Sequence, residues 1–249
     1  MTEHADDLGN VVTLPADVRR VVSIVPSLTE SIATTHVHLL VGATDWCTHP
    51  RELDVTRVRG TKNPDLDLIR SLEPDVVVAN AEENRAVDLD VLRTLGIAVW
   101  TTSPTTVDES LDSLERMLSA ITGEVPAWLE EARVEWSTPY IGKRRPAVVP
   151  IWRRPWMALG RDTFAGDVLA RIGIDNVLSD SGERYPRIDV EALPDHDLVV
   201  LPDEPFPFSP DDGPEAFVRP AKCVSGRHLT WYGPSLVEAR DVLTAQLRS

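Results

Sequence analysis

Cys47 and His49 carry the side chains with the clearest metal-binding chemistry in the sequence. They flank one threonine in the stretch DWCTHP. Thiolate and imidazole are good ligands for soft and borderline transition metals, and residues this close can converge on one ion. Two ligands do not complete a metal site, so the competing interpretation is that both side chains pack within a loop. His228 is the candidate for a third ligand.

Aromatic residues are concentrated in the loops that follow the predicted strands. Their rings have large apolar faces, which in a cleft favour a bulky, flat or apolar ligand. We expect some of these rings to face a ligand and others to belong to the core of a lobe. The residues concerned are Trp46, Trp152, Trp156, Phe206, Phe208, Trp231 and Tyr232.

Two adjacent arginines, Arg153 and Arg154, lie between Trp152 and Trp156. A guanidinium group binds carboxylates and other anions through its planar set of donors. The pair is therefore a candidate for contact with anionic groups of a ligand. A solvated basic pair on the surface is the alternative interpretation.

Each half of the chain carries acidic residues directly after an apolar, strand-like run. DVVVANAE begins at Asp75 and DLVVLPDE begins at Asp197, and the two segments match in spacing. Ligands of open α/β sheets bind beyond the carboxyl ends of the strands. Glu82 and Glu204 are therefore candidate ligand contacts, and the repeat suggests that the two halves share one plan.

Signatures of nucleotide binding and hydrolysis are absent from the sequence. It contains no GxxxxGK[ST], GxSxG, HExxH or CxxC, and the stretch GRDTFAG is not a phosphate loop. A catalytic function therefore has little support.

Alternating strand-like and helix-like segments position these residues. In the first half, strands are predicted over residues 21–25, 40–44, 75–79 and 97–100, and helices over 29–34, 64–72, 88–95 and 108–122. In the second half, strands are predicted over residues 147–152 and 197–201, and helices over 163–173, 189–193 and 235–247. Asn63 is the predicted N-cap of the 64–72 helix. The order predicts an α/β fold with two Rossmann-like lobes.

The stretch GEVPAWLEEARVEWST, residues 123–138, is predicted to be a stiff helix that joins the lobes. Apolar residues recur at helical spacing, and the helix would span about 20 Å. An ordinary surface helix of one domain is the alternative. The predicted organisation is a loose N-terminal tail over residues 1–17, one lobe over 18–122, the connecting helix over 123–142 and a second lobe over 143–249.

Asp67 and Glu191 each lie early in a predicted short helix, one in each lobe, and point outward. Acids in a first turn are favoured by the helix dipole alone. The functional interpretation is a pair of contacts for a docking partner.

The balance of charge excludes several functions. With a formal net charge of -15 and a pI near 4.8, the chain is not expected to bind nucleic acid, because phosphate would be repelled.

No segment reaches the roughly 20 apolar residues that span a bilayer, so we expect no membrane insertion. The first residues lack the features of a secretory signal, so the chain as written is expected to be cytoplasmic. Cys47 and Cys223 are compatible with one disulfide or with two thiols.

Six pieces that together span nearly the whole chain resemble the helical-backbone metal receptor family, the substrate-binding proteins of ABC importers for iron-siderophore, haem and cobalamin. They are VVSIVPSLTESI from Val21, VGATDWCTHP from Val41, RGTKNPDLDLIRSLEPDVVVANAEEN from Arg59, IWRRPWMALGRDTFAGDVLARIGIDNV from Ile151, YPRIDVEALPDHDLVVLPDEPFPF from Tyr185 and LTWYGPSL from Leu229.

The resemblance implies two α/β lobes joined by one long helix, with the ligand in the cleft between them. It also implies that an acidic residue on each lobe forms a salt bridge with arginines of an ABC permease, and Asp67 and Glu191 match those positions. Asp67 is one methylene shorter than the usual Glu. The larger departure is the missing signal sequence, which a subgroup with similar pieces shares.

The predicted function is therefore capture of a metal chelate for an ABC importer by a monomer without an intrinsic cofactor. The chelate would be cobalamin or another corrinoid, haem or a ferric siderophore, and this role would place the protein outside the cytoplasm. The alternatives are a cytosolic carrier or sensor of such a chelate, and an enzyme acting on it through Cys47, His49 or Glu82. The residues assigned to the implied cleft are Trp46, Cys47, His49, Lys62, Glu82, Glu83, Asn84, Trp152, Arg153, Trp156, Glu204, Phe206, Trp231 and Tyr232.

Overall fold

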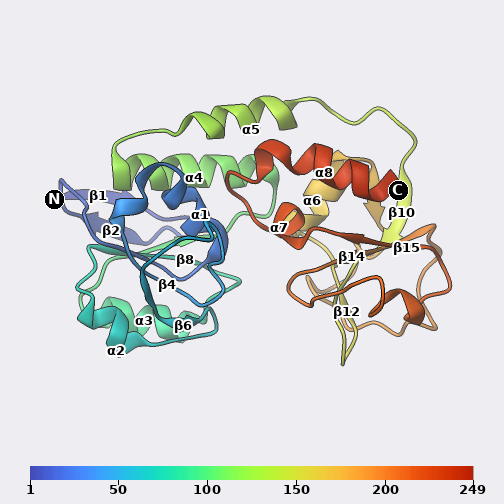
Figure 1. The fold of residues 1–249 in the computed structure, drawn as a ribbon, viewed down its shortest axis with the longest axis horizontal. Helices are drawn as coiled ribbons and strands as arrows, with labels where there is room; N and C mark the ends of the chain where they lie inside the picture. The colour runs from blue at the N-terminus through green and yellow to red at the C-terminus, as the bar shows by residue number, and fades with distance from the viewer. Residues whose placement is uncertain (249) are drawn as a thin grey trace. The chain divides into compact units, whose positions relative to one another are not determined.

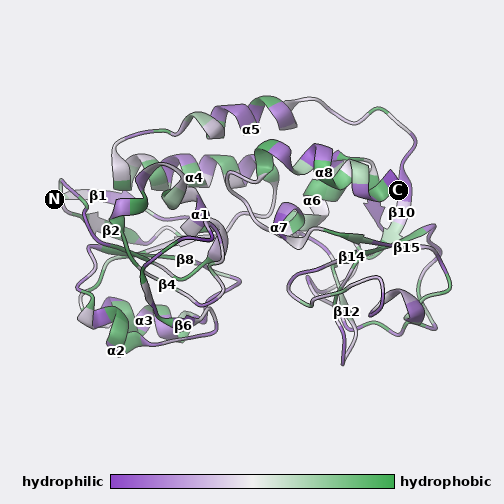
Figure 2. Cartoon of the chain, in the orientation of Figure 1, coloured by the Kyte–Doolittle hydropathy of each residue, from purple (hydrophilic) through white to green (hydrophobic). Residues whose placement is uncertain are grey.

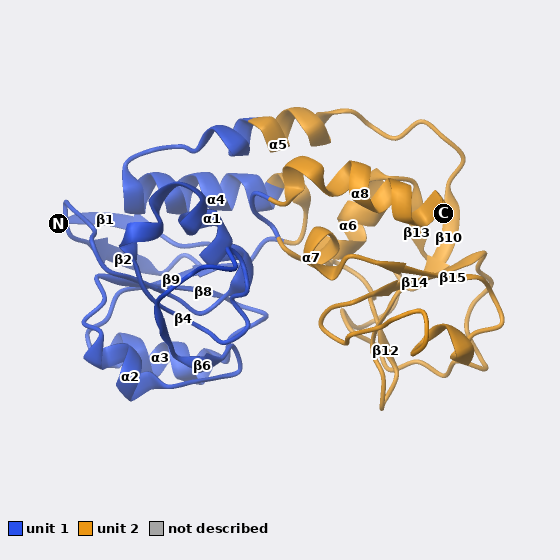
Figure 3. Ribbon diagram, in the orientation of Figure 1, with its two compact units in different colours: residues 1–104, 109–130, 232–234 blue, residues 105–108, 131–231, 235–249 orange. Residues whose placement is uncertain are grey.

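The computed structural model describes residues 1–248, and Ser249 lies outside the described residues. The chain divides into two compact units (Figure 3). Unit 1 comprises residues 1–104, 109–130 and 232–234, and unit 2 comprises residues 105–108, 131–231 and the described part of 235–249. Each unit contains a parallel sheet with helices packed against it, so the predicted α/β class is confirmed.

The sheet of unit 1 has the strand order β5-β4-β3-β8-β9, and all neighbouring strands are parallel. Its strands are β3 (Val21–Ser23), β4 (Leu40–Ala43), β5 (Thr56–Arg57), β8 (Val76–Asn80) and β9 (Val99–Thr102). Every residue of β8 is buried, as expected for a central strand that is covered on both faces. The apolar run after Asp75 therefore forms the middle of the unit.

Helices cover both faces of this sheet. Figure 1 shows α2 and α3 on one face and α1 and α4 on the other. The helices and the short 3-10 turn are α1 (Pro26–His36), η1 (Val37–Leu39), α2 (Leu66–Ser71), α3 (Ala86–Thr94) and α4 (Val107–Thr122). In Figure 2 apolar colour follows one side of α4, and its buried residues Leu111, Leu114 and Leu118 recur at helical spacing.

The predicted N-cap at Asn63 is wrong. Asn63 and Pro64 form the short strand β7 (Asn63–Pro64), which pairs antiparallel with β6 (Arg59–Gly60). Asp65 caps α2 instead, because its carboxylate accepts a hydrogen bond of 3.1 Å from Leu68 N.

The predicted loose tail is also wrong. The first residues form an antiparallel hairpin from β1 (Thr2–Ala5) and β2 (Val11–Leu14). The Asp6 carboxylate closes the turn by accepting hydrogen bonds from Leu8 N and Asn10 N. Asp7 N donates to Thr101 O at 3.1 Å, which joins the hairpin to β9.

The helix predicted between the lobes exists as α5 (Ala127–Ser137), and Leu129, Ala132 and Trp136 on it are buried. Its first four residues belong to unit 1 and the others to unit 2, but α4 is divided between the units as well. A single connecting helix is therefore not confirmed, and the lobe boundaries stay predictions.

The sheet of unit 2 has the order β13-β10-β14-β15, again with parallel neighbours. Its strands are β10 (Arg145–Val148), β13 (Ile174–Asn176), β14 (Leu198–Pro202) and β15 (Ala221–Val224). The predicted strand over 147–152 is split, because Pro150 has no amide hydrogen for a central ladder. The central strand β10 ends at Val148. Pro150 begins a separate strand, β11 (Pro150–Trp152), which pairs antiparallel with β12 (Met157–Ala158).

The remaining helical segments of unit 2 are α6 (Phe164–Arg171), η2 (Pro214–Ala216), α7 (Gly226–Thr230) and α8 (Leu236–Arg248). Figure 1 shows α6, α7 and α8 on one face of the sheet. Residues 189–193, predicted as a short helical turn, form a turn and not a helix. Ala192 N donates to Asp189 O in a turn, and Pro194 follows closely, so the turn does not continue as a helix.

Candidate functional site

The loop after β4, residues 44–50, carries Trp46, Cys47 and His49 at the carboxyl end of the unit 1 sheet. Their environments differ sharply. The Trp46 side chain is 65% exposed, His49 is half-buried, and Cys47 is fully buried. Trp46 is therefore accessible, and its contact with a ligand stays a prediction.

Cys47 is held inside the loop by polar neighbours. Its Sγ atom lies 3.0 Å from Thr29 Oγ1 and 3.1 Å from Thr44 Oγ1. Burial raises the pKa of the Cys47 thiol, and the two threonine hydrogen bonds offset only part of that rise. A buried thiol that keeps its proton is a poor metal ligand, which favours the packing interpretation.

The structure does not bring a third ligand to Cys47 and His49. Within residues 1–248 no group of three or more His, Cys, Asp and Glu side chains is arranged to hold a metal ion. His228, the candidate third ligand, belongs to unit 2, where its Nε2 lies 3.0 Å from Glu238 Oε1. Cys47 and Cys223 are both free cysteines.

The hairpin of β6 and β7 stands beside the Trp46 loop and presents Lys62 at its tip. Asp45 N donates to Arg59 O at 2.8 Å, which joins the loop to the hairpin. Lys62 is exposed, and its Nζ donates to the backbone oxygen of Glu82. The ammonium group therefore lies next to the loop that carries Glu82 and Glu83, both half-buried.

Asn84, predicted as a ligand contact, is buried and holds backbone groups together. Its Nδ2 donates to Ile24 O at 3.2 Å and to Thr61 O at 2.9 Å, and its Oδ1 accepts from Asn80 N at 2.8 Å. These contacts join β3, the Lys62 hairpin and the end of β8. We interpret Asn84 as a residue that positions the loops.

Tyr232 is likewise buried within unit 1. Asn80 Nδ2 donates to its hydroxyl at 2.7 Å, and Thr102 Oγ1 lies 2.7 Å from the same atom. Burial raises the pKa of the Tyr232 phenol far above its ordinary value. The phenol therefore stays protonated and acts as a core hydrogen-bonding group.

In unit 2 the aromatic residues separate into a core and a surface set. Trp156 stacks on Phe208 with ring centroids 5.8 Å apart, and Phe208 is buried. Trp152 is 42% exposed and meets Phe206 edge-to-face at 5.7 Å. Trp156 and Phe206 are both half-buried and pack against the cluster that contains Phe208, so Trp152 is the more exposed candidate for ligand contact.

Arg153 is occupied by contacts within unit 2. Its guanidinium lies 5.3 Å from the Trp156 ring centroid and forms ion pairs with Asp212 and with Glu215, the latter at 2.6 Å. A residue with these partners is better suited to hold the 212–215 segment than to bind an anionic ligand.

Glu204 and Trp231 form a hydrogen-bonded pair after β14. Trp231 Nε1 donates to Glu204 Oε2 at 2.8 Å. Burial raises the pKa of the Glu204 carboxyl, and the hydrogen bond from Trp231 offsets part of that rise. Trp231 is 6% exposed, so its indole presents little surface to a ligand.

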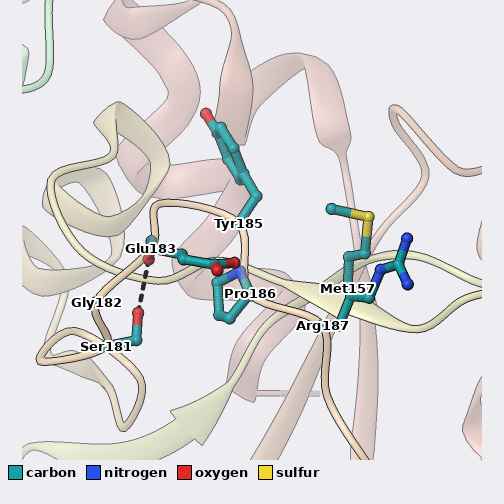
Figure 4. A pocket seen from close by; sticks show the side chains of 7 residues that line it. All are labelled: Met157, Ser181, Gly182, Glu183, Tyr185, Pro186 and Arg187. Carbon is teal, nitrogen blue, oxygen red and sulfur yellow. Dashed lines mark hydrogen bonds between the residues drawn. The ribbon is translucent and has the colours of Figure 1, made fainter.

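A pocket of about 510 Å³ in unit 2 was not foreseen from the sequence (Figure 4). Its lining residues are Met157, Ser181, Gly182, Glu183, Tyr185, Pro186 and Arg187. Met157 pairs with Trp152 on one side and with Arg187 on the other. Partners directly opposite in antiparallel pairs share a face, so Trp152 continues the row formed by Met157 and Arg187.

The pocket combines apolar, aromatic and charged side chains. Figure 4 shows Met157 and Arg187 side by side, apart from Glu183 and Tyr185. Such a lining suits a ligand with an apolar body and a peripheral anionic group. No local sequence pattern reveals the pocket, because it joins Met157 to residues 181–187, which are distant in the sequence.

The candidate docking residues are both exposed. Asp67 lies in the first turn of α2, as predicted. Glu191 lies in the 189–192 turn, where its N–H donates to Asp189 Oδ1 at 3.0 Å. As for membrane insertion, the helices of the described chain include none with the length and apolarity to cross a bilayer.

Comparison with known proteins agrees with this architecture. No family model matches the chain. The vitamin B12-binding protein of Vibrio cholerae serotype O1 is 23% identical over 187 residues, which cover 72% of this chain and 68% of that protein.

Two solved structures share the fold. The periplasmic haem-binding protein RhuT from Roseiflexus sp. RS-1 has a TM-score of 0.73 and 18% identity over 92% of this chain and 97% of that one. Nickel-bound CeuE from Helicobacter pylori has a TM-score of 0.82 and 16% identity over 99% and 88%. These likenesses confirm the resemblance to these binding proteins at the level of the fold.

Proposed function

We propose that this protein is the substrate-binding component of an ABC importer and captures a metal chelate without changing it chemically. The observation that carries the proposal is the similarity, over 72% of the chain, to a vitamin B12-binding protein. The relatives are described as vitamin B12-binding, haem-binding or nickel-bound. The proposed chelate class is therefore cobalamin or another corrinoid and haem, and the resemblance of the sequence adds ferric siderophores.

The exposed side chains at the carboxyl ends of both sheets support this function. In unit 1 they are the Trp46 indole and the Lys62 ammonium. In unit 2 they are Trp152 and the pocket with Tyr185 and Arg187. Wide rings and cationic groups match large planar or amphiphilic ligands that carry anionic substituents.

Docking to a permease and a location outside the cytoplasm are parts of the same proposal. Asp67 and Glu191 are exposed acids, one in each unit, and can form ion pairs with arginines of a membrane partner. Cell fractionation tests the location. A pool confined to the cytoplasm would instead support a carrier or sensor of the same ligand class.

Ligand binding is tested by a thermal-shift screen with cyanocobalamin, haemin and a ferric siderophore. A true ligand at a hundredfold excess over its Kd adds about 2.7 kcal/mol to the free energy of unfolding and raises Tm. The shift should shrink in Trp46→Ala and persist in Ile141→Ala, a substitution at a residue that is 96% exposed. Mass spectrometry after long incubation should recover the chelate unaltered. A modified product would overturn the proposal in favour of an enzyme.

A further inference from the structure

The backbone of the Trp46 loop is fastened by one side chain, Arg57. Its Nη1 donates to Thr44 O at 2.9 Å and to Cys47 O at 3.0 Å, and its Nη2 donates to Leu53 O at 3.0 Å. These three carbonyls lie at the beginning, the middle and beyond the end of the loop. One guanidinium group thus joins segments that would otherwise be connected only through the chain.

Arg57 is itself held by the sheet of unit 1. It is the last residue of β5 and pairs with Ala43, the last residue of β4. The loop starts at the next residue after Ala43, so the arginine is anchored beside the point from which the loop leaves the sheet. The planar guanidinium group has several donors in fixed directions and can therefore bind three carbonyls at once. A lysine ammonium lacks this geometry and does not reproduce the three contacts.

The Trp46 indole packs close to the backbone of Gly60. A Cβ atom on Gly60 would lie 3.3 Å from Trp46 Nε1, so the ring rests near a backbone position that carries no side chain. The Asp45 N to Arg59 O hydrogen bond of 2.8 Å fixes the residue before Trp46 to the same hairpin. Arg57 therefore holds the loop backbone around Trp46, and the β6–β7 hairpin limits the position of the Trp46 ring.

We propose that Arg57 is a positioning residue that holds the Trp46 loop, residues 44–50, in the conformation in which Trp46 presents its indole to a ligand. The fastening of the loop follows from the three carbonyl contacts. The consequence for ligand affinity rests on the proposed function.

The fastening is tested without any ligand by hydrogen exchange of the loop amides. Cys47 N donates to Thr44 O and Leu53 N donates to Pro50 O, so both amides report on the loop. Arg57→Lys should accelerate their exchange at least tenfold relative to amides of β8, because charge-assisted hydrogen bonds to the loop carbonyls are lost. The matched control is Arg70→Lys, at an exposed arginine on α2. Normalising to β8 separates local opening from global destabilisation, and an unchanged ratio would overturn the proposal.

The effect on binding is tested by a double-mutant cycle with cyanocobalamin and haemin as probes. Arg57→Lys should raise the Kd of a bound probe about tenfold in the wild-type background, and by no more than about twofold in the Trp46→Ala background. Equal losses in both backgrounds would show that Arg57 does not act through Trp46. If the wild-type protein binds neither probe, those ligands are excluded while the exchange result still decides the role of Arg57.

Discussion

The indole N–H of Trp231, the residue after α7, donates a hydrogen bond of 2.8 Å to the carboxylate of Glu204, which follows β14 of the unit 2 sheet. The tightness of this packing depends on Gly226, because a Cβ atom there would lie 2.5 Å from Glu204 Cβ. The half-buried carboxyl therefore has an indole partner and a backbone wall, and the positive charge of Arg227 partly offsets the effect of burial on its pKa.

Glu204→Gln should remove a pH dependence from folding stability. Burial raises the pKa of Glu204 in the folded protein above its unfolded value. The folded state then binds more protons between the two pKa values, so this group lowers stability as the pH rises through that window. Gln keeps the acceptor for Trp231 without the charge. We expect the variant to unfold with a free energy higher by about 1 kcal/mol or less at pH 7, since the side chain is partly solvated.

Urea unfolding at several pH values checks this prediction. The difference between the two proteins should vanish near the unfolded pKa of glutamate, at about pH 4. A variant that is less stable than the wild type at pH 7 and equally stable at low pH would contradict the assigned direction.

Tyr232→Phe should destabilise the protein. The substitution removes a buried hydroxyl that bonds to Asn80 Nδ2 and Thr102 Oγ1, both at 2.7 Å. It leaves buried polar groups without their partner, which costs about 1–3 kcal/mol. Tyr140→Phe is the matched control, because the Tyr140 hydroxyl bonds to Lys143 O at an exposed site. Chemical denaturation should separate the two variants, and equal stabilities would refute the structural role of Tyr232.

The two tryptophans of the β11–β12 hairpin should have separable roles. Trp156 is half-buried and stacks on Phe208 of the core cluster, so Trp156→Ala should cost about 2 kcal/mol of stability. Trp152 is 42% exposed, so Trp152→Ala should cost less than about 1 kcal/mol and should weaken chelate binding instead. Denaturation and titration of both variants check this. The reverse pattern would mean that the surface and core assignments are exchanged.

The docking hypothesis predicts a loss of transport without a loss of binding. Asp67 and Glu191 are exposed, so Asp67→Lys combined with Glu191→Lys should leave the Kd for the chelate unchanged. Uptake in cells should fall to the level of a strain without the protein, because charge reversal repels arginines of a permease. Retained uptake would show that these acids are not the docking contacts.

Strongly patterned elements were predictable from the sequence, and short ones were not. The apolar runs of β8 and β14 and the periodic helices α4 and α5 carry their own signals. The short strands β13 and β15 and the helix α7 have few residues, so their conformation depends on neighbours distant in the sequence. The N-terminal hairpin depends on hydrogen bonds that the Asp6 carboxylate accepts within the turn. The sequence of this charged segment does not indicate those hydrogen bonds.

The candidate site was predictable in location and less so in detail. Trp46 and Cys47 are adjacent in sequence, yet the first is 65% exposed and the second is fully buried. The different exposure of the two side chains depends on contacts that Arg57 and Thr29 make with the loop, and both of these residues lie on other elements. The pocket of Figure 4 joins Met157 to residues 181–187, and no local pattern links segments that far apart.

Isothermal titration of the purified protein with cyanocobalamin, haemin and a ferric siderophore is the decisive test of chelate capture. We expect saturable binding of one chelate at a ratio of one per chain, weakened at least tenfold by Trp46→Ala, with the chelate recovered chemically unchanged. Binding of none of these chelates, or binding that is indifferent to Trp46 and Trp152, would contradict it.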